Sequence, residues 1–252
     1  MTQDQNTVIR QQFGNAAADY VTSEVHATGA DLARIAAIAK ATSPAVALDL
    51  GAGGGHVSYA MAPHAGQVIA SDLSADMLRV VAAQADRRGL ANVTTLTAEA
   101  GALPLPDASI DMLACRFTVH HWRDAAAGLA EARRVLKPGA PAVFVDVIAP
   151  PEAAADTHLQ AVELLRDPSH GRDYTVREWH AMLAAAGFTI TATTPSRLRM
   201  DFPTWIARMR TPPAHVTAIR ALQNLAGAEI AQHFDLESDG SFTIDVITIE
   251  VC

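Results

Sequence analysis

A glycine-rich stretch near residue 50 is the first place in the chain where residue types and spacing suggest chemistry. It follows a short apolar run, precedes helical spacing, and reads Asp49-Leu50-Gly51-Ala52-Gly53-Gly54-Gly55-His56. Glycines at a strand-to-helix turn let the backbone approach a ligand without a Cβ clash. Asp72 ends a second apolar run, where a carboxylate can accept hydrogen bonds from both ribose hydroxyls. The spacing therefore predicts a nucleoside site.

Two kinds of nucleoside cofactor use such a turn and acid. In the dinucleotide pattern the sixth position is Gly or Ala, whereas this chain has His56, and the third glycine falls one place early. Asp49 would repel a pyrophosphate but attract the ammonium and sulfonium of a methionine-containing cofactor. These features favour S-adenosylmethionine over NAD. Asp49 could instead serve only to accept hydrogen bonds from local backbone.

Short β-rich runs alternate with longer helical runs from about residue 45 to 147, the pattern of βαβ units and a parallel sheet. Helices are expected over 76–88, entered through Ser74, and over 125–136. The runs predicted as strands are 45–50, 67–71, 93–97, 110–114 and 142–147. Continuously apolar strands are typical of burial on both faces, so helices should cover both sides of the sheet.

Helical spacing also occurs before and after this core. Residues 1–42 are expected to form a helical lid segment, and residues 150–235 inserted helices that shape a pocket, within one domain over 1–252. Beyond residue 147 the pattern predicts a helix to about 166, a polar loop at 167–173 and a capping-box helix from Thr175 to 186. It then predicts a strand over 188–194, a helical segment over 203–231 and an alternating last strand over 242–251.

The composition excludes several classes of function. The net charge is -8 and the 19 Lys and Arg are dispersed, which argues against nucleic-acid binding and for a small-molecule acceptor. The first residues lack the order of a signal peptide, and no apolar run reaches the roughly 18–20 residues that span a bilayer, so we expect a cytoplasmic protein. Cys115 and Cys252 have neither disulfide nor metal-ligand spacing, so no metal is predicted.

Four segments together resemble the class I S-adenosylmethionine-dependent methyltransferases, and within them the group of the ubiquinone/menaquinone C-methyltransferases. They are Asp49–Gly55, Ser71–Met77, Leu103–Asp107 and Leu136–Gly139. The resemblance implies a doubly wound, mostly parallel seven-stranded α/β sheet of Rossmann-like type whose last strand is antiparallel. It also implies transfer of a methyl group from S-adenosylmethionine to a small organic acceptor, with S-adenosylhomocysteine as the product.

The resemblance also assigns residues to the cofactor. By position, the methionine part would contact Asp49, Gly51, Ala52 and Gly53, and the ribose would contact Asp72. The adenine ring would contact Leu73 and Met77, and its amino end Glu99 and Ala100. The transferred methyl group would lie near Arg116 and Phe117. Gly101 departs from the family, which commonly has an acid there. Two alternatives remain open, namely an NAD(P)-dependent oxidoreductase and a non-catalytic or cofactor-modifying protein that binds S-adenosylmethionine.

His120 and His121, after the fourth predicted strand, are the candidate catalytic residues. Methyl transfer needs mainly an acceptor held in line, and a base only when the acceptor must lose a proton. Histidine titrates in the right range for that task, and His121 is the preferred candidate. Either histidine could instead cap a helix and pack over the cofactor.

Further candidates lie outside the sheet. They are Phe13, Tyr20 and His26 for the lid, and Arg166, His170, Arg172 and Tyr174 for the acceptor pocket, although a solvated helix or loop face is the favoured interpretation of each. Trp179 and Trp205 are expected to anchor the core. The sequence leaves open the identity of the acceptor and the oligomeric state, for which a homodimer is one possibility.

Overall fold

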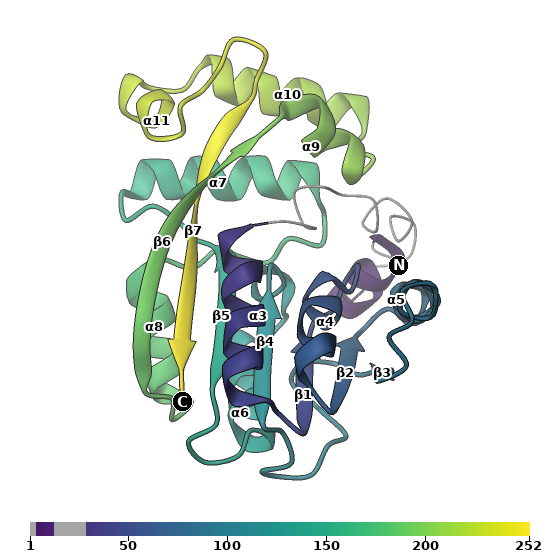
Figure 1. Ribbon diagram of the computed structural model, residues 1–252. Coiled ribbons are helices and arrows are strands. Elements are labelled where there is room, and N and C mark those ends of the chain that lie inside the picture. The colour runs from purple at the N-terminus through teal and green to yellow at the C-terminus, as the bar shows by residue number, and fades with distance from the viewer. Residues whose placement is uncertain (1–3, 13–28) are drawn as a thin grey trace.

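The computed structural model describes residues 4–12 and 29–252 (Figure 1). Seven strands form one sheet in the order β3-β2-β1-β4-β5-β7-β6. The strands are β1 (Val46–Leu50), β2 (Gln67–Asp72), β3 (Val93–Thr97), β4 (Met112–Arg116), β5 (Ala142–Val147), β6 (Ile190–Met200) and β7 (Phe242–Val251). β1 to β5 pair in parallel, and β7 runs antiparallel to both β5 and β6. The predicted fold class, with its antiparallel last strand, is confirmed.

Helices cover both faces of the sheet. The helices of this part are α3 (Ala30–Thr42), α4 (His56–Met61), α5 (Ala75–Arg87), α6 (Ala125–Val135) and α8 (Val176–Ala185). Successive residues of β1 point to opposite cores, since Ala47 packs in the cluster that includes Ile35 of α3, whereas Leu48 packs with Leu129 of α6. This two-sided burial explains why the central strands are continuously apolar.

The helix starts follow the predicted capping residues. Ser74 accepts a hydrogen bond from the backbone N–H of Met77 at the start of α5. Thr175 and Glu178 form the reciprocal capping box of α8. A third cap was not predicted, since Asp124 caps α6 by accepting a hydrogen bond from the backbone N–H of Ala127. These caps satisfy amide groups that have no partner inside their helices.

A group of helices lies beyond the carboxyl ends of the strands (Figure 1). These cap helices are α7 (Ala153–Arg166), α9 (Phe202–Arg208), α10 (Pro213–Asn224) and α11 (Ala228–His233). The sequence suggested one helical segment over 203–231, but the structure has three helices there. The interruptions fall at Pro212, which has no backbone N–H to donate, and at Gly227, which favours non-helical backbone.

β6 differs most from its predicted extent, because it continues to Met200 instead of ending at residue 194. Pro195 lies inside it, which the edge position of β6 permits since one side of the strand needs no partner. β6 and β7 run together from the sheet into the cap helices (Figure 1). The two strands therefore connect the two parts of the molecule.

The N-terminal region is helical where the structure describes it, over residues 5–12 and in α3. The lid candidates Phe13, Tyr20 and His26 lie outside the described residues. Within residues 4–12 and 29–252, every helix is too short or too polar to cross a lipid bilayer.

Gly128 of α6 offers a test of this packing. Glycine to alanine normally stabilises a helix by about 1 kcal/mol. Here a Cβ at position 128 would overlap the ring of Trp122. We therefore expect Gly128→Ala to lower the free energy of unfolding by about 1–3 kcal/mol, measured by urea denaturation. In a Trp122→Leu background the same change should be neutral or stabilising, and a Gly128→Ala protein more stable than wild type would contradict this packing.

Candidate active site

A cavity lies at the carboxyl ends of the parallel strands, beside the point between β1 and β4 where the strand order reverses. Open α/β sheets bind ligands at such a point. The cavity wall includes the predicted residues Asp49, Gly51, Ala52, Gly53, Asp72 and Leu73. It also includes Glu99, Ala100, Arg116, Phe117, His120 and His121. Among the candidates for cofactor binding and catalysis Met77 is the exception, because its buried side chain lies behind Gly53 rather than on the wall.

The glycine loop is shaped so that backbone, not side chains, faces the cavity. Gly51, Gly53 and Gly55 have φ angles of +79°, +48° and +81°, which side chains on L-residues rarely allow. A Cβ on Gly51 would stand 2.5 Å from Oγ1 of Thr118, in the turn after β4. The loop and that turn therefore touch, and only glycine fits between them.

Asp49 is a buried carboxylate at the end of β1. Its Oδ2 accepts hydrogen bonds from the backbone N–H of Ser58, at 2.9 Å, and from the Ser58 hydroxyl, at 2.6 Å. Burial outweighs these bonds and raises the pKa of Asp49 to about 7. The residue therefore both holds the start of α4 and places a titratable acid on the cavity wall.

Asp72 connects the glycine loop to α5. Its Oδ2 accepts from the backbone N–H of Gly53 at 2.9 Å, and its Oδ1 from that of Ser74 at 2.8 Å. Burial raises the pKa of this carboxyl, opposed by these backbone donors. Next to it, the buried Ser71 hydroxyl makes no hydrogen bond within the described part of the chain, although Ser71 lies on the cavity wall.

Arg116 and Phe117 mark the end of β4. The Arg116 guanidinium is ion-paired with Asp31 of α3 and lies 4.7 Å from the centroid of the Phe117 ring. Phe117 itself has a φ of +54°, a strained value for a residue with a large side chain. Glu99, after β3, lies 3.6 Å from the guanidinium of Arg123. Both ends of the predicted cofactor site thus carry acid and base side chains.

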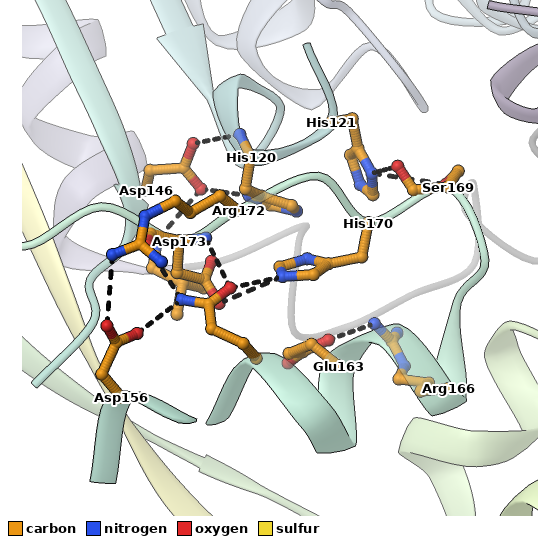
Figure 2. Close-up of polar contacts among 12 residues, drawn as sticks. His120, His121, Asp146, Asp156, Glu163, Arg166, Ser169, His170, Arg172 and Asp173 are labelled. Atoms are coloured by element: carbon orange, nitrogen blue, oxygen red, sulfur yellow. Dashed lines mark hydrogen bonds and ion pairs between the residues drawn. The ribbon is translucent and has the colours of Figure 1, made fainter. Parts of the chain in front are cut away.

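His120 forms a buried ion pair with Asp146 of β5. The distance from His120 Nδ1 to Asp146 Oδ1 is 2.5 Å (Figure 2). Burial by itself lowers the pKa of His120, but the charge of Asp146 and this hydrogen bond outweigh it and raise the pKa to about 9. With Nδ1 bound to the carboxylate, Nε2 is the ring nitrogen left to meet an acceptor.

His121 has the opposite electrostatic environment. Burial, followed by the positive charge of His120, lowers its pKa to about 4. Its Nδ1 lies 3.2 Å from the backbone carbonyl oxygen of Ser169, in the loop after α7. The Ser169 hydroxyl in turn donates to Asp167 at 2.6 Å. His121 is therefore neutral near pH 7 and joined to the loop that leads from the cap helix α7 to α8.

The four predicted acceptor-pocket residues are distributed unevenly. Arg166 lies on the cavity wall and is ion-paired with Glu163 at 3.3 Å. His170 is buried behind the wall. Arg172 instead pairs with carboxylates of α7 and α8, and Tyr174 packs edge-on against Trp179. Trp179 is a core residue, as expected, whereas buried Trp205 also contributes to the wall.

Several residues of the site escaped the sequence analysis. Asp146 carries the clearest missed signal, an acid inside the otherwise apolar run 142–147. Glu163, Asp173 and Arg208 reach the cavity wall from the cap, where no local pattern marks them. No group of three or more potential metal ligands occurs in residues 4–12 and 29–252.

Comparison with known proteins agrees with this geometry. Residues 48–144 match the family described as "Methyltransferase domain". The chain is 41% identical over 196 residues to the uncharacterized protein YafE of Escherichia coli, covering 78% of this chain and 95% of that protein. It is 32% identical over 243 residues to the uncharacterized methyltransferase YcgJ of Bacillus subtilis, covering 94% and 96%.

Two further likenesses extend the comparison. The crystal structure of YcgJ superposes with a TM-score of 0.84 at 31% identity, over 88% of this chain and 97% of that one. A demethylmenaquinone methyltransferase of Thermus thermophilus is 34% identical over 131 residues, which cover 50% of this chain and 59% of the relative. This chain belongs to the S-adenosylmethionine-dependent methyltransferase family. It is an enzyme that transfers a methyl group from S-adenosylmethionine.

The cavity wall fits this cofactor. The glycines Gly51, Gly53 and Gly54 line the cavity without side chains, Asp49 supplies negative charge where the methionine end is expected, and the Ser71 hydroxyl lacks a partner among the described residues. A buried polar atom without a partner is unusual, and a bound polar ligand would satisfy it.

Asp49 predicts that cofactor binding is linked to protons. Cationic groups of S-adenosylmethionine favour the ionised carboxylate, and the pKa of Asp49 in the free protein is about 7. Affinity should therefore rise with pH, by up to about tenfold per unit from pH 5.5 to 7, and then level off. Calorimetry in buffers of different ionisation enthalpy would measure the proton released. S-adenosylhomocysteine, which lacks the sulfonium charge, should show a weaker pH dependence.

The matched variant is Asp49→Asn, which retains the shape and the contact with Ser58 but cannot ionise. We expect weaker binding that no longer varies with pH in this range. An Asp49→Asn protein with the wild-type pH dependence would contradict the assignment of the linked proton to Asp49.

Proposed function

We propose that this methyltransferase acts on a small organic acceptor with an ionisable hydroxyl of phenol or enol type. The pairing of His120, which lies on the cavity wall, with the buried Asp146 is the observation that carries the proposal. A base whose conjugate acid has a pKa near 9 is matched to phenolic hydroxyls, whose pKa is about 10 in tyrosine. Apolar side chains of Phe117, Leu198 and Met200 on the same wall suit a ring.

The names of several relatives support this class of acceptor. They include demethylmenaquinone methyltransferases and ubiquinone/menaquinone C-methyltransferases. The chain spans 59% of the Thermus protein, so the acceptor of that protein is a guide to chemical class only. A net charge of -8 and the absence of a concentrated basic segment favour a small molecule over a nucleic acid.

For the cofactor we propose the arrangement that the sequence suggests. Its methionine part would lie over Asp49 and the loop Gly51, Ala52 and Gly53, and its ribose at Asp72. Its adenine would lie between Leu73, Glu99 and Ala100. Met77 would support the loop from behind, and Arg116 and Phe117 would lie at the methyl end. The position of these residues on or behind one wall supports this arrangement. The product left there would be S-adenosylhomocysteine.

In the proposed reaction His120 is the general base, in preference to His121. Neutral His120 accepts the acceptor's hydroxyl proton at Nε2, and Asp146 stabilises the imidazolium that results. Bound S-adenosylmethionine supplies a methyl carbon that bonds to the ionised acceptor while the carbon–sulfur bond breaks and its electron pair stays on sulfur. His121, with a pKa of about 4 and its Nδ1 at Ser169, is the poorer base and holds the loop.

The cap and the N-terminal helix would enclose the acceptor. Glu163, Arg166 and Trp205 of the cap lie on the wall, as do Asn6 and Ile9 of the helix over 5–12. Gln5 donates a hydrogen bond to the Ser169 carbonyl at 2.7 Å, which ties this helix to the loop beside His121. We therefore assign a lid role to the described N-terminal helix and acceptor selection to residues 150–235.

The pH profile tests the general base. Panels of hydroxyarenes, enols, amines and thiols, assayed for S-adenosylhomocysteine formation, would first identify an acceptor. Because His120 is protonated below its pKa of about 9, kcat/KM should rise about tenfold per pH unit and level near pH 9. Asp146→Asn removes the attraction that raises this pKa, so the rise should move down by two units or more, with a plateau about 10²–10⁴-fold lower.

Glu237→Gln is the control, since Glu237 pairs with Arg199 on an exposed face and should leave the profile unchanged. An Asp146→Asn enzyme with the wild-type pH profile would rule out His120 as the base. Activity confined to amines or thiols would overturn the acceptor class.

A further inference from the structure

Another acid on the cavity wall, Asp173, has a carboxyl oxygen that accepts no hydrogen bond from the described residues. The side chain is 1% exposed and contributes to the wall. Its Oδ2 makes no hydrogen bond within the described residues. The nearest cationic candidate, His170 Nε2, stands 3.8 Å away, beyond hydrogen-bond distance.

Gln160 of α7 explains why His170 does not satisfy this oxygen. His170 Nε2 lies 2.9 Å from Gln160 Oε1. The Gln160 amide is oriented by two acceptors, because its Nε2 donates to Asp156 Oδ1 and to the backbone oxygen of Asp173, each at 2.9 Å. Oε1 is therefore an acceptor, and the single Nε2 proton of His170 is donated to it rather than to Asp173.

The same glutamine fixes Asp173 in place. Gln160 Oε1 accepts from the Asp173 backbone N–H at 3.1 Å, while Gln160 Nε2 binds the Asp173 carbonyl oxygen. Both backbone groups of Asp173 are thus held by one side chain, which fixes the position of this residue on the cavity wall. A buried acceptor without a donor is costly, and such a carboxyl on a cavity wall is suited to a ligand that donates.

The surroundings favour a neutral donor over a cationic one. The neighbouring acids already have positive partners, since Asp146 pairs with His120 and Glu163 with Arg166. Burial raises the pKa of Asp173 itself to about 8, so near pH 7 the carboxyl is mostly uncharged. A hydroxyl group satisfies such a carboxyl without adding a buried charge.

We propose that Asp173 is a specificity-determining residue whose carboxyl group accepts a hydrogen bond from a second hydroxyl of the methyl acceptor, apart from the one that His120 deprotonates. This inference rests on the proposed function and adds the requirement that the acceptor carry two hydroxyl groups. His120 follows β4 and Asp173 follows α7, so the acceptor would bind between the sheet and the cap and contact both.

Paired acceptors that differ by one hydroxyl test this directly. The wild-type enzyme should methylate a dihydroxy arene with kcat/KM at least tenfold above that of its monohydroxy counterpart, because the analogue leaves Asp173 without a donor. Asp173→Leu, of similar size but unable to accept, should abolish this preference by raising KM for the dihydroxy compound only. Asp173→Asn retains an acceptor oxygen and should restore most of the preference.

Affinity for S-adenosylhomocysteine, measured by calorimetry, shows whether each variant keeps its cofactor site. A wild-type enzyme that methylates both compounds equally would overturn the role of Asp173 while leaving the proposed function intact, and this comparison needs no variant. A Leu variant that binds cofactor normally and keeps the preference would also overturn it. Methylation of neither compound, with activity on amines or thiols, would overturn the proposed function and this inference with it.

Discussion

The carboxylate of Asp146 is the constraint on which the rest of the site depends. It is 1% exposed, at the carboxyl end of the central strand β5. Burying a charge costs several kcal/mol unless donors surround it. Here Oδ2 accepts from the backbone N–H of Val119 at 3.0 Å, and Oδ1 from that of Val147 at 2.9 Å and from the His120 ring. Satisfying Asp146 therefore requires the turn after β4 to fold over β5.

That turn contacts both the glycine loop and the loop that follows the cap helix α7. On one side Thr118 fills the space beside Gly51, so the glycine loop and the turn fit together. On the other side the His120 carbonyl oxygen accepts from the backbone N–H groups of Gly171, at 2.7 Å, and Arg172, at 3.0 Å. The sheet, the glycine loop and the cap thus meet at the residues next to His120, the proposed base. These contacts hold the His120–Asp146 pair in place between the proposed positions of cofactor and acceptor.

Local sequence patterns predicted most of the sheet. The predicted strands 93–97, 142–147 and 242–251 coincide with β3, β5 and β7, because their apolar periodicity reflects burial directly. The fourth strand lies two residues later than predicted, at Met112–Arg116, and β6 continues through Pro195. In both cases the pairing with a neighbouring strand sets where the strand begins or ends. Neither Pro195 nor the residue types at the strand ends reveal that pairing.

The cavity-wall residues that follow strand ends could be predicted, because the strand order in an α/β sheet places those ends together. The residues on the cap side of the cavity could not be predicted in this way. Asp173 and Gln160 are separated by a helix end and a polar loop, and their contact exists only after the loop folds against His120. Similarly, the adjacent His120 and His121 have opposite pKa shifts. Asp146 outweighs the burial of His120, whereas burial and the charge of His120 lower the pKa of His121, and the local sequence does not distinguish the two.

The most direct test of this account is the titration of His120 itself, followed by ¹⁵N chemical shifts of ring-labelled histidine in the protein bound to S-adenosylhomocysteine. Loss of the His120 signal in a His120→Gln protein would assign it. The account predicts an imidazolium at pH 8 that deprotonates near pH 9, while His121 stays neutral down to about pH 4. A His120 that is neutral at pH 8, with a pKa near the ordinary 6.5, would contradict it.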